Sequence, residues 1–183
     1  MYENGEGVKQ DFVKAVSLYK RSCDMEGIEG CSRLGWMYEN GQGVKQNIVK
    51  ALSLFKMSCD KGSGGGCGYE GNMYQSGKGV KKDVWTAFTL YKKACAAGNP
   101  YGCNSLGWMY ENGEGVKQNC MKALAVYKWS CDMGNTWGCY YMGQMYFNGE
   151  GIDNDVQKAT SLFQKACNEG NAQACEKLNS MYR

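Results

Sequence analysis

The sequence lacks histidine entirely and has no long hydrophobic run. Without histidine, the chain has no Ser–His or Cys–His nucleophile pair, no HExxH zinc motif and no histidine acid–base chemistry. Its longest apolar stretches fall well short of the roughly 18 residues that a membrane-spanning helix needs. The net charge of +3 is too small to indicate electrostatic binding of nucleic acid. We therefore expect no metal site, no cofactor, no membrane span and no nucleic-acid partner.

What the sequence does contain is a repeat with a period of 36 residues. A Met-Tyr pair recurs in the same register along the whole chain, at Met1, Met37, Met73, Met109, Met145 and Met181. A fixed period of this length is typical of helical solenoids, in which each unit buries its apolar face only against its neighbours. We predict an all-α fold, an α/α solenoid or superhelix of helix-turn-helix repeats like those of tetratricopeptide proteins.

Each repeat is predicted to hold two short amphipathic helices. The first runs from about Cys31 to Asn40 in the clearest copy, with Leu34 and Met37 on its apolar face and Gly41 as its stop signal. The second begins after an N-cap residue, at Asp11, Asn47, Asp83, Asn119 and Asp155. Glycine recurs inside the first helix, at Gly35, Gly71, Gly107 and Gly143. Because glycine costs about 1 kcal/mol in a helix, its recurrence predicts a tight helix crossing.

The repeats predict one solenoid over residues 1–183. Partial repeats over 1–31 and 176–183 flank four full ones, over 32–67, 68–103, 104–139 and 140–175. The chain opens on Met1-Tyr2-Glu3, in the middle of a repeat, and carries no signal peptide. We interpret it as a fragment or processed product whose targeting segment is missing.

Ten of the eleven cysteines form five pairs with a spacing of eight residues. The pairs are Cys23/Cys31, Cys59/Cys67, Cys95/Cys103, Cys131/Cys139 and Cys167/Cys175. Cytosolic thiols stay reduced, so regular pairing predicts a secreted or periplasmic protein. Zinc sites favour a closer Cys-x2–4-Cys spacing, so we interpret the pairs as local disulfides. A bridge from Cys31 to Cys59, at the same end of one hairpin, is the alternative. Cys120 is left over and is interpreted as a buried free thiol.

A Ser-x-x-Lys pattern, found in serine β-lactamases, begins at Ser17 and at Ser53. The same positions read Thr89/Lys92, Ala125/Lys128 and Ser161/Gln164 in the other copies, so they are ordinary repeat positions. The companion Ser-Asp-Asn and Lys-Thr-Gly motifs are absent. We predict no catalytic residue and keep Ser17 and Ser53 as weak candidates.

The repeat resembles the Sel1-like repeat family in Leu34-Gly35-x-x-Tyr38, Gly41-x-Gly43-Val44, Lys50-Ala51 and Phe55-Lys56. With cysteine at both paired positions, the sequence resembles the disulfide-rich branch of that family, the Helicobacter cysteine-rich proteins. The resemblance implies a secreted superhelix that binds a peptide or protein on its concave face, with a role in contact between bacterium and host. Members of that branch also carry a penicillin-binding or weak β-lactamase label. The label implies a β-lactam or a cell-wall fragment as the alternative ligand.

Outward positions of the first helix vary between copies, and we predict that they form the binding surface. Their spacing of i, i+3 and i+7 places them on one ridge of each helix. First helices line the concave face of a helical solenoid, and tryptophan, tyrosine and arginine are common hot-spot residues. The predicted residues are Arg33, Trp36, Asn40, Tyr69, Asn72, Ser76, Trp108, Asn112, Tyr141, Gln144 and Asn148. The alternative is that Trp36 and Trp108 pack between helices and that the asparagines only end the first helix.

Overall fold

The computed structural model describes residues 2–3 and 9–181, and it is all-helical over that part of the chain. The helices are α1 (Phe12–Asp24), α2 (Ile28–Asn40), α3 (Ile48–Asp60), α4 (Gly64–Ser76), α5 (Val84–Ala96), α6 (Pro100–Asn112), α7 (Cys120–Asp132), α8 (Thr136–Asn148), α9 (Val156–Asn168) and α10 (Ala172–Met181). Even-numbered helices are the first helices of the predicted repeat, and odd-numbered helices are the second. The predicted fold class is confirmed. Residues 1, 4–8 and 182–183 of the predicted partial repeats lie outside the described residues.

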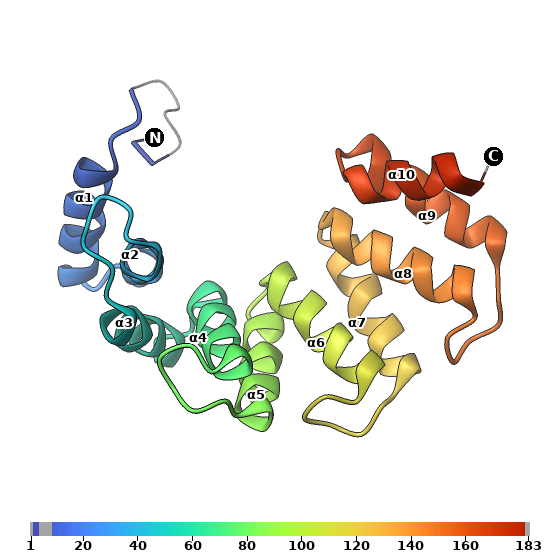
Figure 1. The fold of residues 1–183 in the computed structure, drawn as a ribbon, viewed down its shortest axis with the longest axis horizontal. Coiled ribbons are helices and arrows are strands. Elements are labelled where there is room, and N and C mark those ends of the chain that lie inside the picture. Colours follow the sequence, from blue (N-terminus) through green and yellow to red (C-terminus); the bar gives the residue numbers. More distant parts are fainter. Residues whose placement is uncertain (1, 4–8, 182–183) are drawn as a thin grey trace. The chain divides into compact units, whose positions relative to one another are not determined.

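The helices, which are labelled in Figure 1, belong to two compact units. Unit 1 is Met1–Asn99 and carries α1 to α5, while unit 2 is Pro100–Arg183 and carries α6 to α10. Within each unit, every helix packs against the next one along the chain. The even helices also touch one another, α2 against α4 in unit 1 and α6 against α8 in unit 2. Each unit therefore presents a surface made of two neighbouring first helices.

Helix ends follow the predicted polar and glycine signals. The side chain of Asn47 accepts a hydrogen bond from the backbone N–H of Lys50 at 2.9 Å, and the equivalent N-caps act in the same way. Gly41 ends α2 in the left-handed conformation, with φ of 69°, which only glycine adopts without strain. The first helices begin three residues before the predicted start, at Ile28 in α2. The third residue of α2, α4, α6 and α8 is glycine, which interrupts the apolar pattern at the start of these helices, so apolar periodicity did not reveal their opening turns.

The recurrent glycines allow the predicted close approach of the two helices in a hairpin. A Cβ atom on Gly107 would lie 2.5 Å from Cε1 of Tyr127, and one on Gly35 would lie 2.7 Å from Cε1 of Phe55. Both rings are fully buried. In these hairpins an aromatic ring of the second helix therefore packs directly against the glycine of the first, and the tight crossing is confirmed.

Local disulfides join the last turn of a second helix to the start of the following first helix. Four of the bridges are Cys23–Cys31, Cys59–Cys67, Cys131–Cys139 and Cys167–Cys175, with Cα atoms 4.5 to 4.8 Å apart. Cys95 and Cys103 are also disulfide-bonded, and Cys120 is free. The local pairing is confirmed, and the alternative bridge from Cys31 to Cys59 is wrong.

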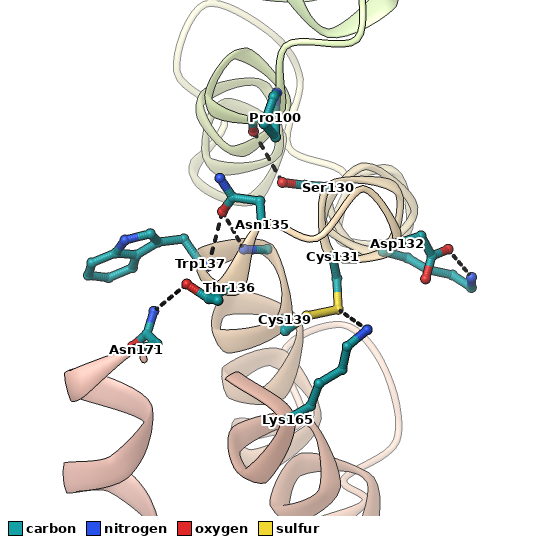
Figure 2. Close-up of a disulfide and its surroundings, with 12 residues drawn as sticks. Pro100, Ser130, Cys131, Asp132, Asn135, Thr136, Trp137, Cys139, Lys165 and Asn171 are labelled. Atoms are coloured by element: carbon teal, nitrogen blue, oxygen red, sulfur yellow. Dashed lines mark hydrogen bonds and ion pairs between the residues drawn. A yellow bond between two sulfur atoms is a disulfide. The ribbon is translucent and has the colours of Figure 1, made fainter. Parts of the chain in front are cut away.

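Polar contacts surround the Cys131–Cys139 bridge and join successive repeats (Figure 2). The Ser130 hydroxyl donates to the carbonyl oxygen of Pro100 at 3.1 Å. The Asn135 side chain caps α8 by accepting from the backbone N–H groups of Trp137 and Gly138. Its oxygen also accepts from the amide of Asn104 on α6 at 2.9 Å. The disulfide and these buried hydrogen bonds hold neighbouring first helices in register, so they position the surface between α6 and α8.

Candidate functional site

A pocket of about 550 Å³ lies in unit 2, between α6, α8 and the turns that follow them. Five of the eleven predicted binding residues line it, namely Trp108, Asn112, Tyr141, Gln144 and Asn148. The remaining lining residues are Glu111, Gln118, Cys120, Glu150 and Gly151. The structure thus brings together the predicted ridges of two successive repeats and adds residues that the ridge argument did not include.

Two carboxylates are the main charged groups of this pocket. Oε2 of Glu111 accepts a hydrogen bond from the hydroxyl of Tyr127 at 2.7 Å, and Oε1 of Glu150 accepts one from Nδ2 of Asn148 at 2.7 Å. Burial raises the pKa of Glu111, the Tyr127 hydrogen bond opposes this, and the Glu150 carboxyl raises the pKa further. None of the ten lining residues is lysine or arginine. The pocket lining therefore carries negative charge and contains no cationic side chain.

Aromatic rings form the apolar part of the pocket. The side chain of Trp108 is 40% exposed, so much of its indole is available to a ligand. Tyr141 stacks on Tyr127, with ring centroids 5.2 Å apart, and lies 5.8 Å from the ring of Trp137. Burial raises the pKa of Tyr127 far above its ordinary value, with Glu111 adding to the effect. Tyr127 thus remains a neutral donor that holds the Glu111 carboxylate in place.

The predicted residues of unit 1 are more engaged in packing and capping. Trp36 is half-buried against the cluster of Ala51, Phe55 and Met73, and Tyr69 stacks on Phe55 with centroids 4.9 Å apart. Arg33 is exposed and lies 3.7 Å from a carboxylate oxygen of Glu3. These contacts agree with the packing alternative for Trp36.

Several predicted polar residues bond to their own helix. The Asn40 amide donates to the carbonyl of Trp36, and the Asn112 amide donates to that of Trp108, both at 2.9 Å. The Ser76 hydroxyl donates to the carbonyl of Asn72 at 2.7 Å. Gln144 donates to the hydroxyl of Tyr140, also at 2.7 Å. Asn40 and Asn112 therefore help to end their helices, which agrees with the alternative that the asparagines serve as helix ends.

Cys120 differs from its prediction, because it is half-buried rather than buried and it lines the pocket. A Cβ atom on Gly151 would lie 2.7 Å from its sulfur, so the thiol packs against the turn that follows α8. The sequence did not indicate this turn contact, because it joins residues of two different repeats.

The weak catalytic candidates belong to unit 1 and do not line this pocket; they lie on the exposed sides of α1 and α3. The hydroxyl of Ser17 donates to the carbonyl of Lys14 at 2.8 Å, and that of Ser53 donates to the carbonyl of Lys50 at 2.9 Å. In the described part of the chain, no three His, Cys, Asp or Glu side chains are grouped to hold a metal ion. No helix within that part has the length and apolar character to cross a membrane.

The fold and the disulfide pattern define a protein built from stapled helical-hairpin repeats. The Sel1 repeat matches residues 1–26, 28–63, 68–99, 100–135 and 138–171. The chain belongs to the Sel1 repeat family. A comparison with curated proteins gave no significant match.

Three solved structures are similar over most of the chain. A Sel1 repeat protein from Oxalobacter formigenes is 30% identical, with a TM-score of 0.90, over 100% of this chain and 74% of that one. The c5321 protein, a protective antigen present in uropathogenic Escherichia coli strains, is 33% identical with a TM-score of 0.82. That match covers 98% of this chain, which spans only 38% of c5321. Helicobacter pylori cysteine rich protein B is 35% identical, with a TM-score of 0.55, over 72% of this chain and 95% of that one.

Proposed function

We propose that this chain is a secreted or periplasmic binding module that takes a peptide segment of a partner protein on the surface of α6 and α8. The observation that carries the proposal is the pocket of about 550 Å³, which gathers five predicted ridge residues from two repeats. Its lining combines aromatic rings with amides, the groups that grip side chains and peptide backbone respectively. Its walls are helices held by disulfides, so the site is preorganised.

The disulfides support this compartment, because disulfides form and persist in oxidising environments outside the cytoplasm. The similarity to Helicobacter cysteine rich protein B and to an antigen of a uropathogenic bacterium supports an exported protein that meets host molecules. A cell-wall peptide is the other source of a peptide ligand for such a protein.

The β-lactamase alternative has less support from the geometry. Ser17 and Ser53 are exposed, and each hydroxyl donates its proton to a backbone carbonyl oxygen of its own helix. Nitrocefin hydrolysis by the pure, oxidised protein tests this alternative. We expect the rate of buffer alone. Hydrolysis that disappears in Ser17→Ala or Ser53→Ala would establish the enzyme and set aside the binding module.

Selection of peptides tests the proposal directly. Nine-residue random peptides displayed on phage are selected on the oxidised chain, and the affinity of the best synthetic peptide is measured by calorimetry. Trp108→Ala should weaken binding about 30-fold, because truncating a central aromatic anchor costs on the order of 2 kcal/mol.

Lys128→Ala is the matched control, since Lys128 is an exposed residue of α7 that pairs with Asp132 on its own helix. This variant should bind like the wild type. Circular dichroism and thermal melting of both variants accompany the measurement. Unchanged affinity in Trp108→Ala, or a loss of many degrees in its melting temperature, would place the binding surface elsewhere.

A further inference from the structure

The same structural slot occurs once in each unit, 72 residues apart in the sequence. In unit 2 it is formed by Trp108, Glu111 and Asn112 of α6 together with Tyr141 of α8. The equivalent residues of unit 1 are Trp36, Glu39 and Asn40 of α2 and Tyr69 of α4. The slot of unit 1 can therefore be compared directly with the pocket of unit 2, because the two have the same residue types at these four positions.

The two slots differ in charge at one of the lining positions, in the turn after the second of these helices. In unit 1 that residue is Lys78, whose Nζ lies 2.8 Å from Oε1 of Glu39. The Glu39 side chain is only 13% exposed, so its carboxylate is largely removed from water and is matched by the lysine ammonium. The lysine side chain of the next repeat therefore supplies the cation that the slot in unit 1 requires.

In unit 2 the equivalent turn residue is Glu150, so a second carboxylate takes the place of the ammonium. Glu111 accepts from Tyr127 and Glu150 accepts from Asn148, but both donors are neutral. Glu111 is half-buried and Glu150 is exposed, and both carboxylates face the same pocket. They repel when both are ionised, which agrees with the direction of the Glu111 pKa. A cation entering from outside would relieve that repulsion.

We infer that the pocket of unit 2 binds a lysine-type ammonium group, held between the Glu111 and Glu150 carboxylates and beside the Trp108 and Tyr141 rings. The ammonium takes the place that Lys78 fills in unit 1. Aromatic faces attract such cations within about 6 Å, and a pocket of about 550 Å³ admits a lysine side chain with part of its peptide. The inference rests on the proposed function in assigning the ammonium to a side chain of the peptide ligand.

The n-butylammonium ion, which reproduces the lysine side chain, probes this site without any peptide. Titration at pH 7.5 and low ionic strength is followed by the NMR signal of the Trp108 indole N–H, assigned by its loss in Trp108→Ala. Butylammonium should shift this signal saturably, while n-butanol at the same concentrations should not. Equal shifts with the two probes would overturn the inference.

Glu150→Lys is the decisive variant because it installs the residue pair that unit 1 already accommodates. The introduced lysine should form an ion pair with the Glu111 carboxylate, as Lys78 does with Glu39. Butylammonium binding should then weaken roughly ten-fold or more, the order expected when one partner of a charge pair is lost. Glu169→Lys, which makes the same charge change at an exposed position, should bind like the wild type. The converse variant Lys78→Glu should create a second butylammonium site, seen as a new saturable shift of the Trp36 indole. Wild-type affinity in Glu150→Lys would overturn the inference.

Comparing peptide binding with butylammonium binding separates this inference from the proposed function. A peptide from the phage selection is remade with norleucine in place of each lysine. If butylammonium binds but no selected peptide depends on Trp108, the ammonium site stands and the peptide proposal falls. If peptides bind through Trp108 with equal affinity for lysine and norleucine forms, and butylammonium gives no saturable shift, the ammonium site falls alone.

Discussion

Replacing Glu70 by leucine should stabilise the protein, because this residue is a buried acid at an apolar repeat position. Glu70 lies on α4 with 6% of its surface exposed, where other repeats carry Leu34, Leu106 and Leu178, all 4 to 5% exposed. Burial raises the pKa of Glu70, repulsion from Asp60 adds to the rise, and attraction to Lys56 and Lys93 opposes it. The ionised carboxylate is therefore worse placed in the folded state than in the unfolded chain.

The expected gain has two parts. Burying a leucine side chain contributes about 1.5–3 kcal/mol relative to an exposed one, and removing a desolvated charge adds to this. Losing the attraction to the two lysines subtracts part of the gain. A net increase of about 2 kcal/mol in the free energy of unfolding at pH 7.5 is expected, which corresponds to roughly 4–8 °C in melting temperature for a chain of this size.

The gain should depend on pH with a definite sign. A folded-state pKa above the unfolded value of about 4.3 means that protonated Glu70 favours folding. The wild type is then most favoured below about pH 4.3 and loses that contribution as the pH rises through the raised pKa of Glu70. The advantage of Glu70→Leu should thus grow between pH 4 and pH 7.5.

Urea unfolding of both proteins at pH 4, 5.5 and 7.5, with the disulfides intact, measures this difference. Leu106→Glu is the reciprocal control in the next repeat, where we expect a loss of at least about 2 kcal/mol at pH 7.5. A less stable Glu70→Leu at pH 7.5, or an advantage that is the same at all three pH values, would refute the reasoning.

Other predictions concern the staples and the glycines. Non-reducing peptide mapping should recover five local disulfides and leave only Cys120 open to alkylation; a second free thiol would contradict the assignment. Reducing the bridges should lower the free energy of unfolding by about 2–3 kcal/mol for each nine-residue loop, seen as a lower urea midpoint. Gly71→Ala should destabilise by about 1 kcal/mol, since the added Cβ would lie 2.9 Å from Cε1 of Tyr91 and overpacking outweighs the helix propensity gained. Gly68→Ala on the same helix meets nothing closer than 3.7 Å and should instead stabilise by up to about 1 kcal/mol.

The sequence alone determined the features that repeat. The period, the N-caps such as Asn47, the left-handed Gly41 and the cysteine pairing are all set by residues within a few positions of one another. Local hydrogen bonds and short loops depend on such neighbours, so sequence spacing predicts them well. The tight crossing at the repeated glycines was predicted because the glycines recur with the period, and each packs against one aromatic ring at a fixed offset in the hairpin.

Only the tertiary structure decided which ridge residues form a pocket. Periodicity places Trp36 and Trp108 on equivalent faces, but it does not distinguish the half-buried ring from the more exposed one. The pairing of Glu111 with Glu150 joins positions 39 residues apart, on a helix and on the turn that follows the next helix of the same kind. That distance is set by how one repeat stacks on the next, which depends on packing between hairpins. Unit 1 pairs Glu39 with Lys78, whereas unit 2 places Glu150 near Glu111. The sequence alone could not show that these residues interact, because only the stacking of repeats brings each turn against the preceding first helix.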